Sequence, residues 1–200
     1  MTRQIGPIVE ILMQRVRQSG GLAVSENQAV SIYSLCEQIT NLSTKRVTES
    51  STVTIPKEKL IFPFRVLLPN AIGIKRITES GREILRARSI NDLSSYDIGW
   101  FRSISGTRFE SWTQIGFDLL VLYPGSAAAT TVDIEYVKLL THHTDFAASY
   151  NIDSELPSED VEIALSLAEI ILLKRFRLLT TIKSKFTELK KLLLQRGIKI

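Results

Sequence analysis

Basic residues near the C-terminus are the part of this sequence best suited to bind a charged partner. Nine Lys and Arg residues lie between Lys174 and Lys199, and Glu188 is the only acid among them. That stretch carries +8 while the whole chain carries +4, which leaves −4 for the rest. Residues 141–163, just before it, hold six acids and no Lys or Arg. Charge separated in this way indicates a surface that meets a partner or another copy of the chain; the alternative is a solvated helix face beside an acidic loop.

Apolar residues recur between these cations at steps of three and four, which is the spacing of one helix face. An apolar stripe surrounded by basic residues is typical of a helix that docks on a protein partner. The predicted partner-binding residues are Lys183, Lys185, Phe186, Leu189, Lys190, Leu193 and Arg196.

Catalytic and cofactor-binding motifs are absent from the sequence. It contains no GxxxxGK[ST], GxGxxG, GxSxG or HExxH pattern. His142 and His143 are adjacent, so on a strand they point to opposite faces, and no second ligand group stands at a zinc-like spacing. Cys36 is the only cysteine and falls on an apolar helix face, where a thiol is usually inert. We therefore expect no enzyme, no metal and no cofactor.

Two further groups could in principle do chemistry. Asp133 and Glu135 share one face of a predicted strand and could form an acid–base pair, although alternating solvent-facing polar residues explain them more simply. Trp100 and Trp112 could stack on a sugar or a base, but large aromatic residues among short strands belong more often to a core.

The elements that would position these residues indicate an α+β fold. Residues 1–46 predict an antiparallel helical hairpin, with a capping box at Ser25 and Gln28 and an inner face that includes Ile11 and Ile39. Residues 47–140 predict about seven short strands in a β-sandwich or barrel-like insert, with an edge strand at Pro63 and a hairpin turn at Ser80–Gly81. An acidic loop follows at residues 141–156.

Residues 157–200 predict a C-terminal helical segment that packs with residues 1–46. Ser158 is the candidate N-cap, and residues 161–173 are apolar nearly all round, as in a buried helix. One straight helix of about 39 residues would span about 58 Å and overhang a body about 43 Å across. A break at the β-branched pair Thr180–Thr181 is the alternative to that overhang.

Several stretches, taken in order, resemble one family. They are Leu-Met-Gln-Arg-Val-Arg at 12–17 before Gly20-Gly21, Leu-Pro-Asn-Ala-Ile-Gly-Ile-Lys-Arg-Ile at 68–77 before Gly-Arg-Glu-Ile-Leu at 81–85, Trp-Phe-Arg at 100–102, Gly-Thr-Arg-Phe at 106–109, Leu-Val-Leu-Tyr-Pro at 120–124, and Ala-Leu-Ser-Leu-Ala-Glu at 164–169 after the Leu-Pro step at 156–157. This order is similar to that of the head-to-tail connector or adaptor proteins of short-tailed, podovirus-like bacteriophages. The match spans most of the chain and does not include the basic C-terminal end.

The resemblance implies a structural virion protein without enzymatic activity. Such a protein forms a ring, commonly twelve-fold, below the portal; it extends the DNA channel and anchors tail components. The implied partners are the portal protein, tail (nozzle or fibre) proteins and copies of the chain itself. DNA would pass transiently through the lumen, and no membrane would be involved. The protein would be made in the host cytoplasm and reside at the head–tail interface of the virion.

Two other classes of function stay open from the residues alone. A nucleic-acid-binding module would place Lys183, Lys185, Lys190, Lys191 and Arg196 against phosphates. A ligand- or sugar-binding β-sandwich would use the region of Trp100 and Trp112.

Overall fold

The computed structural model describes residues 4–20, 23–96, 99, 104–105, 108–116 and 118–198. It confirms the predicted α+β class, with helices at both ends of the chain and strands in the middle. The chain divides into two compact units: Met1–Val47 together with Leu140–Ile200, and Thr48–Leu139 between them. We call them the helical unit and the β unit.

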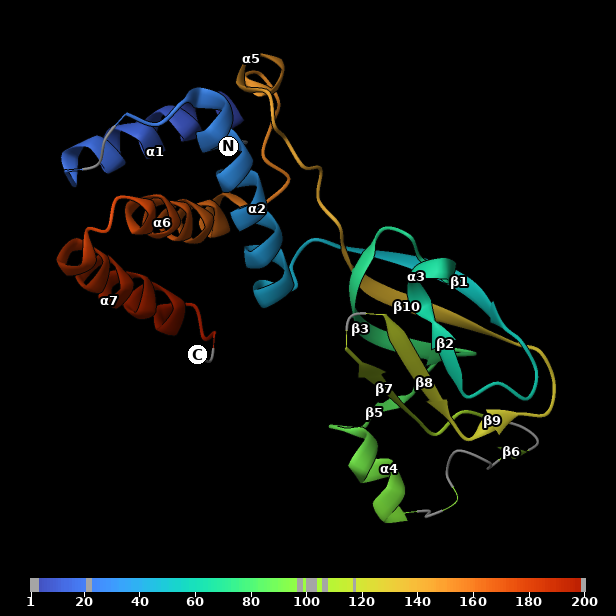
Figure 1. The fold of residues 1–200 in the computed structure, drawn as a ribbon. Helices are drawn as coiled ribbons and strands as arrows, with labels where there is room; N and C mark the ends of the chain where they lie inside the picture. The colour runs from blue at the N-terminus through green and yellow to red at the C-terminus, as the bar shows by residue number, and fades with distance from the viewer. Residues whose placement is uncertain are drawn as a thin grey trace. The chain divides into compact units, whose positions relative to one another are not determined.

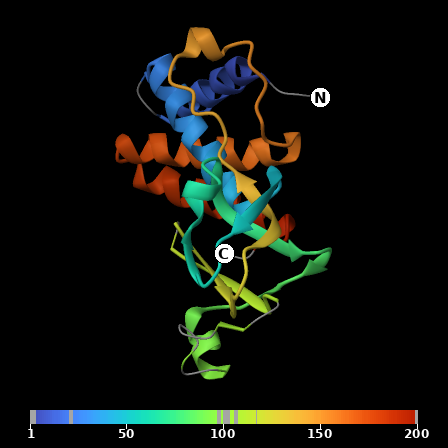
Figure 2. The same cartoon turned by 90° about the vertical axis from the view of Figure 1, so that its right-hand side faces the viewer.

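The helical unit is built around one buried helix. Its helices are α1 (Ile5–Gln18), α2 (Glu26–Thr44), α5 (Phe146–Ser149), α6 (Ser158–Arg175) and α7 (Leu179–Gln195). Helix α6 buries residues on nearly all sides, as its sequence predicted, and α1, α2 and α7 pack against it. Helix α2 is steeply inclined to α1 (Figures 1 and 2), whereas the short connection predicted an antiparallel pair. Both helices instead follow the surface of α6, because that is where their apolar faces are covered.

Two predictions about helix starts have different outcomes. The Ser25 side chain accepts a hydrogen bond from the backbone N–H of Gln28, so the predicted N-cap of α2 is confirmed. The prediction that Ser158 caps α6 is wrong, since the helix already includes Ser158 and its N-cap residue is Pro157. Glu159 and Asp160 in the first turn still complement the positive end of the helix dipole.

The predicted inner faces are wrong for Ile11 and Ile39, which are both exposed. Near Ile39 the buried side of α2 is polar, because Glu37, Thr40 and Asn41 take the inward positions. Glu37 and Asn41 can be buried there because Ser154 and the Val47 backbone hydrogen-bond to them, so a rule that places only apolar residues inside fails at these positions.

Other polar side chains of α2 hold the return segment of the chain, residues 140–156. The Gln38 side chain donates to the carbonyl of Leu140 and accepts from its N–H. The Ser34 hydroxyl donates to the Thr141 carbonyl and accepts from the His143 N–H. The return segment is thus fixed by hydrogen bonds between its backbone and α2 side chains, which satisfy peptide groups that no helix or strand pairs.

Glu37 is the buried titratable member of this set. It is 2% exposed, and its carboxylate accepts a hydrogen bond from the Ser154 hydroxyl. Burial raises the pKa of Glu37 to about 7, against an ordinary value of 4.5, and the hydrogen bond from Ser154 only partly opposes that rise. The buried Tyr33 hydroxyl is its neighbour, and burial followed by the Glu37 charge raises the pKa of Tyr33 far above its ordinary value.

Because the folded chain holds the Glu37 proton more tightly than the unfolded chain, stability should fall as the pH rises from about 4.5 to about 7. Glu37→Gln removes this titration. Between pH 4 and pH 8, the free energy of unfolding of the wild type should fall by about 3 kcal/mol relative to that of Glu37→Gln. Urea unfolding across that range measures the difference, with Glu26→Gln on the exposed first turn of α2 as the control. Parallel pH profiles for Glu37→Gln and the wild type would contradict this assignment.

Helices α6 and α7 are separated by a sharp reversal at residues 176–178. Arg177 has a φ of 57°, in the left-handed region, which a helix cannot continue through. Helix α7 folds back and lies beside α6 (Figures 1 and 2). The C-terminal segment is therefore two helices with no overhang, and the break precedes Thr180–Thr181, which belong to the first turn of α7.

The β unit contains two four-stranded sheets. One has the order β1-β10-β3-β4, and the other has the order β2-β8-β7-β5. Their strands are β1 (Thr48–Ile55), β2 (Ile61–Pro63), β3 (Ala71–Glu79), β4 (Arg82–Glu83), β5 (Leu85–Arg86), β7 (Ser111–Ile115), β8 (Leu119–Tyr123) and β10 (Thr130–Lys138). Smaller elements are α3 (Phe64–Leu67), α4 (Ile90–Tyr96) and the pair β6 (Ile104–Ser105) and β9 (Gly125–Ser126).

One apolar core joins the two sheets, as in a β-sandwich. It includes Ile77 and Ile134 from the first sheet and Trp112 and Leu120 from the second. The predicted turn at Ser80–Gly81 is confirmed: both residues have positive φ, and β3 and β4 pair across them. The predicted edge strand at Pro63 is confirmed by β2, which ends its sheet.

Candidate docking surface on the C-terminal helix

Helix α7 divides the predicted partner-binding residues between two sides. Leu189 is buried and Leu193 is half-buried against the rest of the helical unit. Lys183, Phe186 and Lys190 are exposed. The apolar stripe that predicted docking therefore serves mainly to pack α7 onto α6, and a second face of the same helix points to solvent.

Lys185 and Arg196 are engaged within the chain. The Lys185 ammonium lies 3.3 Å from a carboxylate oxygen of Glu169, a buried residue of α6. Arg196 lies 2.8 Å from Glu159, which also pairs with Arg46. Both cations thus neutralise acids of α6, so part of the charge separation in the sequence is resolved inside the helical unit.

The solvent side of α7 carries three large apolar side chains with lysines between them. Leu179, Phe186 and Leu194 are 67%, 55% and 59% exposed. Lys183 and Lys190 fall between them at helical steps of three and four, so the five residues form one stripe. We call this stripe, Leu179, Lys183, Phe186, Lys190 and Leu194, the α7 outer face.

The surroundings of the α7 outer face are basic. In the described part of the chain, neither Lys183 nor Lys190 has an ion pair, and the same holds for four exposed cations nearby in the sequence. These four are Lys174, Arg175, Arg177 and Lys191. An apolar stripe with uncompensated positive charge is suited to a surface that is both apolar and acidic.

Leu179 and Leu194 were not among the predicted partner-binding residues. Leu179 belonged to the predicted apolar stripe and Leu194 stood outside it, so spacing alone assigned the stripe to one side of the helix. The signal that distinguishes them is angular: at 100° per residue, Leu179, Phe186 and Leu194 fall within about 80° of one another, and their mean direction lies about a quarter turn from the buried Leu189.

The other candidates for chemistry are occupied by structural roles. Burial raises the pKa of the Cys36 thiol to about 12, which keeps it protonated. Asp133 accepts from Thr52, and Glu135 pairs with Lys75 and Arg76; the hydrogen bond from Lys75 lowers the pKa of Glu135. Trp112 is buried, its indole N–H donates to the Ile84 carbonyl and Arg86 lies over its ring, so the ring is not open to a sugar or a base. Trp100 lies outside the described residues.

Across ranges 4–20, 23–96, 99, 104–105, 108–116 and 118–198, no group of three His, Cys, Asp or Glu side chains could hold a metal ion. Within those ranges no helix has the length and apolar character needed to cross a bilayer.

No protein-family model matches the chain, and no curated protein sequence matches it.

The pairing of Lys185 with Glu169 leads to a stability test. Lys185→Met should lower the free energy of unfolding by about 2 kcal/mol, because it leaves a buried carboxylate without its cation, and the partial exposure of Lys185 keeps the loss below that of a fully buried pair. Lys183→Met, on the α7 outer face, should change stability by less than about 0.5 kcal/mol. Urea unfolding compares the two. Adding Glu169→Gln to Lys185→Met should restore most of the loss; full stability of Lys185→Met alone would refute the pairing.

Proposed function

We propose that this chain is a head–tail adaptor of a short-tailed bacteriophage, which docks on the portal through the α7 outer face. The single observation that carries the proposal is this exposed stripe of Leu179, Phe186 and Leu194 interleaved with unpaired lysines. The order of sequence stretches that resembles adaptor proteins supports the same class. A helical unit made from both ends of the chain, with a β unit inserted between them, suits a ring component that presents several surfaces.

A protein partner accounts for the α7 outer face better than nucleic acid does. A duplex presents phosphates to lysines, but its backbone has nothing apolar to cover three side chains that are each more than half exposed. A protein surface can cover those side chains and also supply carboxylates for Lys183 and Lys190. The lysines then speed association and set orientation, and the apolar side chains provide most of the affinity.

The partner at this face is a different chain and not a second copy. The acids of α6 that could have met a neighbour's basic helix are paired internally: Glu159 with Arg46 and Arg196, Glu162 with Arg15, and Glu169 with Lys185. In the proposed assembly, copies of the chain contact one another through other surfaces in a ring of twelve. The ring binds portal on one side and tail proteins on the other, and DNA passes through its lumen.

The proposal is tested with the purified portal ring of the same phage. Leu179→Ser/Phe186→Ser should weaken portal binding about 100-fold, because two apolar anchors lose their burial. Lys183→Gln/Lys190→Gln should mainly slow association and reduce its dependence on salt. Surface plasmon resonance measures both effects, and electron microscopy of the mixture shows whether rings form.

The matched control is Lys57→Gln/Lys59→Gln, which removes two exposed lysines from the β unit and should bind portal as the wild type does. Circular dichroism melts verify that each variant is folded. Unchanged portal affinity in the Leu179→Ser/Phe186→Ser variant would overturn the proposal. The proposal would also be overturned if the wild type did not bind the portal and instead bound duplex DNA through Lys183 and Lys190.

A further inference from the structure

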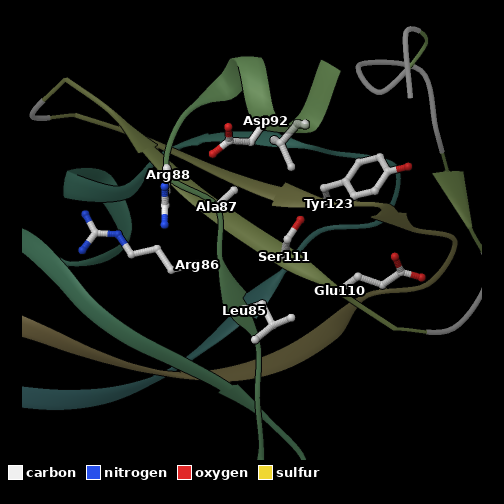
Figure 3. Close-up of a pocket in the computed structure, with 9 residues that line it drawn as sticks. Leu85, Arg86, Ala87, Arg88, Asp92, Glu110, Ser111 and Tyr123 are labelled. Carbon is white, nitrogen blue, oxygen red and sulfur yellow. The ribbon is translucent and has the colours of Figure 1, made fainter. Parts of the chain in front are cut away.

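A groove of about 640 Å³ lies on the β unit, on the sheet that ends in β5 (Figure 3). Its volume falls within the range of about 300–1,000 Å³ that is usual for ligand-binding clefts. Its lining includes Leu85, Arg86, Arg88, Glu110, Ser111 and Tyr123. The first turn of α4 contributes Asp92 and Leu93, and the remaining residues come from β5, β7, β8 and the segments next to them.

The floor of the groove is set by strand register. Leu85 is the neighbour of Ser111 across β5 and β7, and Ser111 is the neighbour of Tyr123 across β7 and β8. Directly paired residues point to the same face of a sheet, so these three side chains form one row across three strands. Leu85 is 74% exposed although it belongs to a strand, so one end of the row is an uncovered apolar side chain.

The two sides of the groove carry opposite charge. Figure 3 shows Arg86 and Arg88 at one side and Glu110 with Tyr123 at the other, with Ala87 and Ser111 between them. Over the described residues, neither guanidinium has an ion pair, and the Glu110 carboxylate has none either. The Arg86 guanidinium lies 5.1 Å from the ring centre of Trp112, which holds it in place by a cation–π contact.

Backbone groups complete the site. Strand β5 is the last strand of its sheet, and the N–H groups of Leu85 and Ala87 donate to carbonyls of Glu110 and Trp112 on the β7 side. Successive residues of a strand direct their peptide groups to alternate sides, so the N–H and carbonyl of Arg86 face the side away from β7. An added strand would find there the groups it needs for pairing.

We propose that this groove binds an extended peptide segment of a partner protein, with an acidic side chain of that segment held between Arg86 and Arg88. The peptide backbone pairs with Arg86 of β5, and apolar side chains of the peptide cover Leu85. Arginine forms two parallel hydrogen bonds with a carboxylate, so the cationic side gives the segment a fixed direction. A nucleic acid is disfavoured, because Glu110 and Asp92 would repel a continuous run of phosphates.

The test selects peptides from a random library against the immobilised full-length chain, with the Arg86→Gln/Arg88→Gln variant used to remove peptides that do not need the cations. We expect selected peptides to contain Asp or Glu. By fluorescence anisotropy, the synthetic peptides should bind Arg86→Gln/Arg88→Gln at least about tenfold more weakly than the wild type. Methylation of alternate peptide nitrogens should abolish binding, since it removes the backbone donors. Lys57→Gln/Lys59→Gln, in the same unit, should bind as the wild type does.

Three results would overturn the inference: no enriched peptide, enriched peptides without acids, or equal affinity for the wild type and Arg86→Gln/Arg88→Gln. Displacement of the peptide by a short DNA duplex would also overturn it, by assigning the cations to phosphate. The groove belongs to the β unit and the α7 outer face to the helical unit, so peptide binding does not depend on the portal-docking proposal. Leu179→Ser/Phe186→Ser should keep full peptide affinity, so failure of one surface does not imply failure of the other.

Discussion

Burial of α6 on nearly all sides is the constraint on which the helical unit depends. A helix with no polar face is stable in water only if other elements surround it, and here α1, α2 and α7 do so. Each of these helices then has one covered side and one side left for other uses. For α7 the covered side includes Leu189, and the side left over is the α7 outer face. The candidate docking surface thus exists because α6 requires α7, in addition to α1 and α2, to cover it.

The ion pairs of the helical unit also follow from the burial of α6. The acids of α6 stand at positions where the surrounding helices bring cations: Arg15 from α1 to Glu162, Lys185 from α7 to Glu169, and Arg196 just after α7 to Glu159. These pairs fix which side of α7 is turned inward, because rotation of the helix would separate Lys185 from a buried carboxylate. The lysines that remain unpaired are consequently concentrated on the opposite side, where they surround apolar side chains.

Local pattern predicted much of this structure, and tertiary context decided the rest. Alternation predicted β10, and glycine and proline marked the turn at Ser80–Gly81 and the edge at Pro63. The apolar residues on nearly all sides of α6 predicted its burial. The inward positions of Ser34 and Glu37 on α2 were not predictable, because their hydrogen-bond partners lie more than a hundred residues away in the chain. The α7 stripe was found, but which of its residues face inward depends on the position of Glu169. The groove beside β5 gave no signal, since Leu85, Ser111 and Tyr123 meet only through sheet register.

The pairing of β1 with β10 has a consequence for how this chain tolerates change. Thr48 and Val137 are directly opposed, so the β unit starts and finishes on neighbouring strands. Opposed residues of antiparallel strands are about 5 Å apart, a gap that a tight turn can bridge. The β unit therefore connects α2 to the return segment as a short loop would, because the β1–β10 pairing holds its two ends close together. Insertions, deletions or exchange of the β unit can therefore change the surface that this unit presents while the path of the helices stays the same.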